Sequence, residues 1–421
     1  MSSVGTLDAR ASVGWLRRFA RTTPGVVGLV AVVVAACCVI AGVVCAAQLN
    51  GRIAERNEVL GRSEPFAYSA QKLYAALSAA DAAAASAYLS GGLETAPMRA
   101  RYQRALADAA SALTDATAGA TDADTRTALA RISAGLAAYT GKVESARANN
   151  LQGFPVGSAY LREASSLMQN SLLPGAEQIY TGKLAALEAD QRAVGSLPIV
   201  ALVSLAGVLV AIVVGSLILI GRTNRQFNKG LVVAVALVIL VIAWIVVANR
   251  FAAASIEQSR TQGTARFEQL ATARILAQEA RTDETLQLIT RGDLTAGEKS
   301  FNGHIGELSA LLAQGPEAAI DGVMKWTASH RKQVELYDDA GDYPAAVAQA
   351  VGSDPSASAA QFAVVESSLG DAIEQTRATL RGGVSTAGSR LAFSPTGTLV
   401  LMVIAASATV VGLWPRLKEF L

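Results

Sequence analysis

The chain has 421 residues, of which 52% are hydrophobic, 17% are charged and 5% are aromatic. This composition is too apolar for an ordinary soluble protein and too charged for a protein built mostly of membrane spans. We therefore expect a chain that is part membrane-embedded and part water-soluble, although its formal net charge is only +2.

Four apolar runs without Asp, Glu, Lys, Arg or His predict four transmembrane helices, since about 20 residues cross a bilayer. The runs cover residues 25–47, 197–220, 230–249 and 396–414. The first run follows a basic segment and resembles a cleaved signal peptide, but its length favours an uncleaved anchor. It contains Cys37, Cys38 and Cys45, which we interpret as packing residues rather than lipid attachment points.

The basic residues beside these runs predict the orientation, because Lys and Arg near span ends stay in the cytoplasm. Residues 1–24, 221–229 and 415–421 together hold nine basic and two acidic residues. This excess predicts a multi-pass protein of the plasma membrane with both termini and the short central loop in the cytoplasm. The two long segments, 48–196 and 250–395, would then lie outside.

The first outer segment, residues 48–196, is predicted to be an antiparallel helical bundle. Ala, Leu, Glu, Gln and Arg dominate it, and strand patterns are scarce. The expected elements are a helix at 48–90 with an interruption at 61–65, helices at 96–118 and 122–148, a loop at 149–158, and a last helix from Ala159. Alanine buries little apolar area, so we expect a slender bundle.

The second outer segment, residues 250–395, repeats this plan. The expected elements are helices at 250–291, 296–313 and 317–339, a loop at 340–356, and a final helix. Gln48 and Gly91 are 43 residues apart, as are Asn249 and Gly292, which favours an internal duplication. The sequence thus predicts an all-α membrane protein with four transmembrane helices and two duplicated extracytoplasmic antiparallel helical bundles.

Two helix breaks predict either a hinge or a static bend in the first bundle. The 43-residue helix would span about 64 Å and the 23-residue helix after it about 35 Å, so the middle helices would not reach the membrane. Each bundle would then be a four-helix head on a two-helix stalk. Pro65 and the pair Pro174 and Gly175 lie where head should meet stalk, and proline removes a helix hydrogen bond there.

Two further patterns suggest contact surfaces. The outermost loops carry aromatic and proline residues, namely Phe154, Pro155, Tyr343 and Pro344, which form either a docking surface or ordinary turns. The second apolar run has small residues at four-residue spacing, namely Gly207, Ala211 and Gly215. Such spacing lets membrane helices approach closely, or else the residues face lipid without a partner.

The sequence contains no recognisable catalytic motif: nucleotide loops, HExxH and nucleophile elbows are missing. His304 and His330 lie 26 residues apart without cysteine neighbours, so surface or capping roles are favoured over a metal site. We expect no enzyme activity, no cofactor and no nucleic-acid partner. The cytoplasmic parts are too short to form domains, so a signal would pass to a separate protein through the termini and the loop that carries Arg222, Arg225 and Lys229.

The layout and three local strings resemble the actinobacterial GlnX-type membrane proteins over nearly the whole chain. The strings are QGFPVGSAYLREASSLM at 152–168, LLPGAEQIY at 172–180 and HRKQVELYDDAGDYPAAV at 330–347. The resemblance implies a link between an external amino-acid-binding lipoprotein of the GlnH type and the cytosolic Ser/Thr protein kinase G, in a pathway that responds to aspartate and glutamate. It implies no binding-residue motif.

Three functions stay open at this point. The leading hypothesis is a non-catalytic transmembrane signal transducer that contacts a lipoprotein outside, lipid in the membrane and, directly or indirectly, a kinase inside; a homo-oligomer is compatible with it. The second is a structural membrane scaffold that organises an envelope complex without switching. The third is a direct small-molecule receptor, which is disfavoured because alanine-rich heads offer few convergent polar groups.

Overall fold

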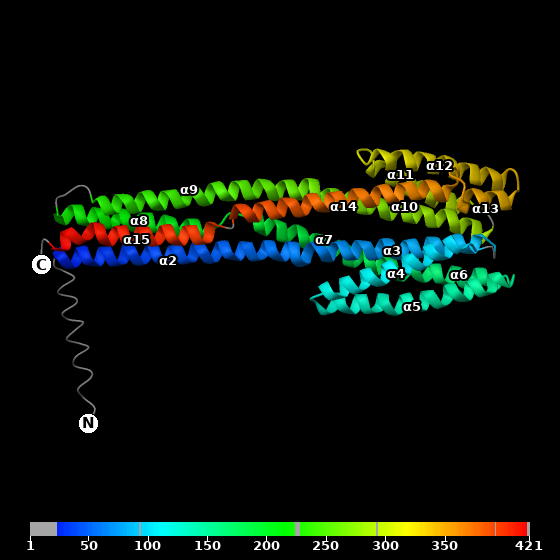
Figure 1. The fold of residues 1–421 in the computed structure, drawn as a ribbon, viewed down its shortest axis with the longest axis horizontal. Helices are drawn as coiled ribbons and strands as arrows, with labels where there is room; N and C mark the ends of the chain where they lie inside the picture. Colours follow the sequence, from blue (N-terminus) through cyan, green and yellow to red (C-terminus); the bar gives the residue numbers. More distant parts are fainter. Residues whose placement is uncertain (1–22, 92–93, 224–227, 292–293, 392, 419–421) are drawn as a thin grey trace, which may run out of the picture. The chain divides into compact units, whose positions relative to one another are not determined.

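A computed structural model describes residues 23–91, 94–223, 228–291, 294–391 and 393–418. These residues form helices joined by short connections, and no strand occurs in the described ranges. Four helical stretches are long and apolar enough to cross a membrane: Pro24–Leu89, Val156–Gly221, Lys229–Thr290 and Ser358–Pro415 (Figure 1). The predicted all-α class and the four spanning helices are therefore confirmed, and the chain is a multi-pass membrane protein.

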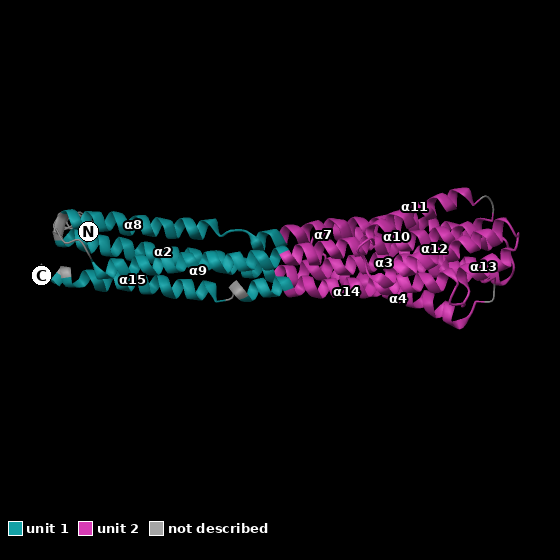
Figure 2. Cartoon of the chain, turned by 90° about the horizontal axis from the view of Figure 1, so that it is seen from above, with its two compact units in different colours: residues 1–57, 191–257, 383–421 teal, residues 58–190, 258–382 magenta. Residues whose placement is uncertain are grey.

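The chain divides into two compact units (Figure 2). The membrane unit comprises residues 1–57, 191–257 and 383–421, and the bundle unit comprises residues 58–190 and 258–382. Both predicted outer bundles are present as halves of the one bundle unit, since their long helices pack along each other. The ends of the predicted outer segments, such as residues 48–57, belong instead to the membrane unit.

The membrane unit is built from α2 (Thr23–Glu58), α8 (Ile199–Thr223), α9 (Lys229–Gln258) and α15 (Ser394–Lys418). Each helix buries one stripe at helical spacing, which on α8 comprises Ala201, Leu205, Val208, Ile212 and Leu219. The other faces remain apolar and exposed, as at Val203 and Val210. A helix that is apolar all round but buried on one stripe suits a lipid environment.

The predicted small-residue stripe on α8 packs only in part. Gly215 is buried, and a Cβ atom there would lie 2.8 Å from Cγ1 of Val30. Ala211 is half-buried, whereas Gly207 is exposed and a Cβ atom there would meet nothing within 4 Å. Gly207 therefore contacts no other described helix of the chain, because it lies outside the buried stripe of α8.

The helices α9 and α15 approach each other closely in the membrane unit. A Cβ atom on Gly412 would lie 2.4 Å from Cα of Gly230, and one on Gly230 would lie 2.4 Å from the carbonyl oxygen of Ala408. Backbone therefore meets backbone at this crossing, and only glycine fits.

We expect Gly412→Val to destabilise the membrane unit by about 1–3 kcal/mol, because the added side chain forces the two backbones apart. The free energy of unfolding of the full chain in mixed micelles, followed by circular dichroism against increasing SDS, would measure the change. Gly207→Val adds the same side chain where nothing lies within 4 Å and serves as the control. If the two variants unfolded at the same SDS concentration, the close approach of α9 and α15 would be contradicted.

The bundle unit contains two halves built on one plan. The first half comprises α3 (Glu64–Leu89), α4 (Ala96–Gly119), α5 (Ala123–Leu151), α6 (Val156–Leu167) and α7 (Leu173–Gly195). The second half comprises α10 (Ala265–Thr290), α11 (Thr295–Leu311), α12 (Glu317–Asp338), α13 (Tyr343–Val351) and α14 (Ser358–Leu391). The central helices α3 and α10 are each 26 residues long and pack against each other. Their equal lengths and places in the chain reflect the duplication.

Side-chain caps explain where several helices begin. The side chain of Thr95 accepts a hydrogen bond from the amide of Met98, and that of Asp122 accepts one from Thr125, at the starts of α4 and α5. Asp342 caps α13 in the same way by accepting from the amide of Ala345. The predicted loop at 340–356 is therefore wrong: its Pro344 stands in the first turn of a helix, where proline needs no hydrogen-bond donor.

The expected helix breaks are π turns that keep the helices continuous. They are η1 (Val59–Ser63) and η2 (Met168–Leu172), and a third π turn that was not expected, η3 (Ser259–Thr264), lies in the second half. Pro65 follows η1, and Pro174 with Gly175 follows η2; the wider turn accommodates the missing amide hydrogen.

The two prolines do not lie at one height, contrary to the hinge prediction. The hydroxyl of Ser63 donates to Oδ2 of Asp190 at 2.6 Å, so Pro65 lies level with the end of α7. Pro174 is then roughly 20 Å farther along that helix, at 1.5 Å per residue. The elements that correspond in the duplication are η1 and η3, which start the two halves.

Candidate functional site

A buried charged cluster occupies the second half of the bundle unit. Glu284 on α10 is 0% exposed and receives three donors. Arg281, one turn earlier, forms an ion pair with it; Nε1 of Trp326 donates to its Oε2 at 3.0 Å; and Nδ1 of His330 lies 3.1 Å from its Oε1. Arg281 and Glu284 are three residues apart on α10, and Trp326 and His330 are four apart on α12, so each pair shares one helix face.

His330 links this cluster to α11. The ring is 3% exposed, its Nε2 lies 2.8 Å from Oε1 of Glu298, and it stacks on Phe301 with ring centroids 3.6 Å apart. Ionised carboxylates only accept hydrogen bonds, so a ring between two of them carries a proton on both nitrogens. The predicted surface or capping role is wrong for His330, because the packing of three helices buries it; His304 stays half-buried beside Asp283.

The charges of this cluster set one another's pKa values. Burial alone would raise the pKa of Glu284, but Arg281 and the hydrogen bond from His330 outweigh it and hold that pKa at about 2. Burial alone would lower the pKa of His330, but its hydrogen bonds to Glu284 and Glu298 raise it to about 9. The cluster is therefore ionised at neutral pH.

The centre of the first half buries an acid whose hydrogen-bond donors are uncharged. Asp81 on α3 is 2% exposed and accepts hydrogen bonds from Ser165 at 2.7 Å, from Tyr139 at 3.2 Å and from Gln169 at 3.2 Å. Burial raises the pKa of Asp81, and these hydrogen bonds only partly oppose the shift. Polar groups of α5 and of the helix through η2 thus converge on one carboxylate of α3.

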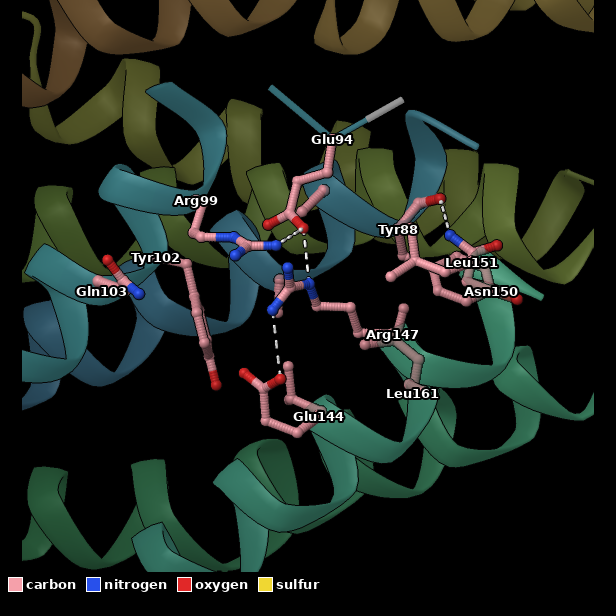
Figure 3. Close-up of a pocket in the computed structure, with 14 residues that line it drawn as sticks. Tyr88, Glu94, Arg99, Tyr102, Gln103, Glu144, Arg147, Asn150, Leu151 and Leu161 are labelled. Atoms are coloured by element: carbon pink, nitrogen blue, oxygen red, sulfur yellow. Dashed lines mark hydrogen bonds and ion pairs between the residues drawn. The ribbon is translucent and has the colours of Figure 1, made fainter. Parts of the chain in front are cut away.

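A small cavity lies at the α3–α4 end of the first half (Figure 3). Arg147 stands between two acids: its Nε donates to Oε2 of Glu94 at 2.6 Å, and its Nη1 lies 3.3 Å from Oε2 of Glu144. Arg99 also reaches Glu94, at 3.4 Å. The free volume is about 40 Å³, room for roughly one or two waters. The ion pairs fill this site, and it holds no small molecule as it stands.

A buried arginine ties three segments of the membrane unit together. Arg52 on α2 donates to the carbonyl oxygens of Val194 and Ser196, at 3.2 Å for Val194, and to Oδ1 of Asn249 on α9 at 3.4 Å. The carbonyl groups belong to the end of α7, where the helix breaks before Pro198. A cation satisfies such unpaired carbonyls well, so Arg52 fixes the junction between α7 and α8.

The predicted contact residues have different environments. Phe154 is 51% exposed, and three apolar or aromatic side chains close to it in the sequence are exposed too: Leu151, Val156 and Tyr160. Pro155 and Pro344 are exposed too. Tyr343 is half-buried: its hydroxyl donates to the carbonyl oxygen of Leu288, and Arg291 lies 4.2 Å from its ring centroid. Tyr343 therefore holds α13 on α10 rather than standing free.

The predicted cytoplasmic coupling residues are only partly described. Arg225 lies outside the described residues, as does the side chain of Arg222. Lys229 is exposed at the first position of α9.

Sequence reasoning missed both buried acids. Asp81 interrupts a run of alanines, and a lone charge on an otherwise small, apolar face could have signalled a buried hydrogen-bonded group. Glu284 and His330 are 46 residues apart, and only the paired spacings, Arg281 with Glu284 and Trp326 with His330, hinted at them. No group of three or more acidic, histidine or cysteine side chains suited to a metal ion occurs among the described residues.

Comparison with known proteins gives one match to part of the chain. A protein-family profile described as an actinobacterial sensor domain matches residues 55–192. No curated protein and no solved structure matches the chain. The matched residues comprise most of the first half of the bundle unit, including Asp81 and the cavity beside Arg147. This similarity to a sensor domain indicates a signalling role.

Proposed function

We propose that the chain is a non-catalytic transmembrane signal transducer. The observation that carries the proposal is the sensor-domain match over the first half of the bundle unit. Helical stretches such as Pro24–Leu89 and Lys229–Thr290 run from the apolar spans into that unit without a break, and a displacement of the bundle helices would therefore move the spans. The basic flanks favour an orientation with both termini inside the cell and the bundle unit outside.

The resemblance to GlnX-type proteins suggests the finer assignment. In it, a GlnH-like lipoprotein delivers an aspartate or glutamate signal from outside, and a cytosolic Ser/Thr protein kinase receives it. The exposed side chain of Phe154 is our candidate for the lipoprotein contact, because aromatic side chains on an exposed loop are common anchors of protein interfaces. The competing scaffold hypothesis predicts binding that does not depend on ligand.

The test is co-purification of the full-length chain in lipid nanodiscs with the lipoprotein, with and without aspartate or glutamate. We expect association that changes with ligand and that falls about tenfold or more in Phe154→Ala. Met324→Ala removes a side chain that is 61% exposed on α12 and is the matched control. Association that ignores ligand, together with unchanged kinase output after deletion of the gene, would leave the scaffold hypothesis in place.

A further inference from the structure

The bundle unit contains a second, much larger space between its two halves. A cleft of about 640 Å³ is lined by α3 and α4 on one side and by α10 and α14 on the other. Small-molecule sites commonly have volumes of about 300–1,000 Å³. The cleft is open because α3 lines it with five alanines, namely Ala75, Ala76, Ala79, Ala82 and Ala83. An alanine side chain ends at Cβ, so the facing helices leave room between them.

Two buried amides line the cleft. Gln71 on α3 and Gln278 on α10 are each 1% exposed. Within the described part of the chain, neither polar atom of Gln71 has a hydrogen-bond partner, nor has Oε1 of Gln278. The Nε2 atom of Gln278 donates to Oε2 of Glu366 at 3.0 Å. A buried polar group without a hydrogen-bond partner is destabilising, and a ligand with both donor and acceptor groups would satisfy these atoms.

Three basic residues line the same cleft from α3 and α4: Lys72, Arg101 and Arg104. Nε of Arg104 donates to the carbonyl oxygen of Ala100, so the other N–H groups of that guanidinium remain available to a ligand. Lys72 and Arg101 form no ion pair with any described residue. Positive charge at this mouth suits a carboxylate.

Two acids of α14 that line the cleft already have partners among the other lining residues. Nε of Arg274 donates to Oε1 of Glu366 at 2.7 Å, and Glu374 accepts from the hydroxyl of Tyr68. Asp108 and Asp371 also line the cleft and offer acceptors for donor groups. The cleft therefore matches a molecule that has both a carboxylate and hydrogen-bond donors better than it matches a bare anion.

We propose that this cleft binds a small organic acid that also carries an amide, amine or hydroxyl group. Its carboxylate would face Lys72, the residue after Gln71 on α3, and its donor and acceptor groups would pair with Gln71 and Gln278. The expectation that alanine-rich helices offer few convergent polar groups does not hold here, because the alanines open the space and the polar groups come from all four helices. Both halves supply contacts, so occupancy favours one arrangement of the halves. The proposal is independent of the lipoprotein partner.

The test uses the full-length chain in lipid nanodiscs and four probes: succinamate, L-malate, succinate and inorganic phosphate. We expect succinamate and L-malate to raise Tm saturably and succinate to bind about tenfold more weakly, because it lacks the donor for Gln71. Gln71→Leu and Lys72→Ala should each abolish the shift. Gln333→Leu is the matched control, since Gln333 is a fully buried amide whose two polar atoms are also unpartnered and which does not line the cleft.

A second measurement keeps the test independent of stability. The cysteines of the sequence, Cys37, Cys38 and Cys45, are replaced by alanine and Ala79→Cys is introduced in the cleft. We expect succinamate to protect this thiol from a maleimide. Failure of both organic probes to shift Tm and to protect the thiol, equal binding of succinate and succinamate, or binding of phosphate alone would each overturn the proposal, as would unchanged binding in Gln71→Leu.

Discussion

Replacing Glu284 with alanine should lower the free energy of unfolding by about 3–5 kcal/mol, the range expected when one partner of a buried ion pair is removed. The variant leaves Arg281 and His330 as buried cations without their main acceptor, and it leaves Nε1 of Trp326 unpaired. Each of these groups then bears its desolvation cost without compensation. Thermal and urea unfolding of the full chain, followed by the near-ultraviolet signal of Trp326 and its neighbours, would measure the loss.

The matched control is Glu335→Ala on α12, because that side chain is exposed. We expect it to change the free energy of unfolding by less than about 0.5 kcal/mol. A loss below about 1 kcal/mol in Glu284→Ala would mean that the cluster is open to water, and the assignment of a buried charged core to the second half would then be wrong.

The helices could be predicted from the sequence because the features that start and end a helix lie within a few residues of one another. Thr95 and Asp122 are capping residues that mark the starts of α4 and α5 within one residue of the expected positions. The apolar runs likewise predicted the four spanning helices, since no other environment tolerates such lengths without charge. The same local reasoning failed at Pro344, where an Asp-Tyr-Pro sequence reads equally as a turn and as a capped helix start.

Side-chain burial could not be predicted, because it depends on which helices meet. His330 has no local feature that separates it from a surface residue, and its acidic partners Glu284 and Glu298 lie on two other helices. One sequence feature could have predicted that the two halves pack together. The helix α3 is alanine-rich on every face, and a helix that is apolar all round is usually buried on all sides. Gln71 then falls inside the unit rather than on its surface.

The duplicated plan also explains how the halves can differ in role. The helices α3 and α10 match in length, yet the centre of α3 buries an acid, Asp81, whose hydrogen-bond donors are uncharged, whereas α10 buries the ionised pair of Arg281 and Glu284. Burial disfavours the charged form of a carboxylate that has no cationic partner, and it therefore raises the pKa of Asp81. The half that matches a sensor domain thus contains a buried acid without a cationic partner, Asp81, whereas in the other half the charge of Glu284 is balanced by Arg281.

His330 makes the stability of the chain depend on pH in the alkaline range. The groups that face its ring are Glu284 and Glu298, with Arg281 beside Glu284. They raise its pKa from the ordinary value of 6.5 to about 9. A group whose pKa is higher in the folded state contributes its full stability below the unfolded pKa and loses it as the pH rises through the folded one. We therefore expect the free energy of unfolding to fall by on the order of 3 kcal/mol between pH 6.5 and pH 9.5.

Unfolding curves of the full chain, measured across this pH window, would test the expectation. The informative quantity is the slope of the free energy of unfolding against pH. His330→Gln keeps a polar side chain but cannot carry the charge, so its overall stability should be lower and its pH dependence in this window should be lost. His304→Gln, which alters the other, half-buried histidine, should keep the wild-type slope. Parallel curves for wild type and His330→Gln would show that His330 is not charged in the folded chain. A neutral ring donates from one nitrogen and accepts at the other, so one of its two carboxylate neighbours would then have to be protonated.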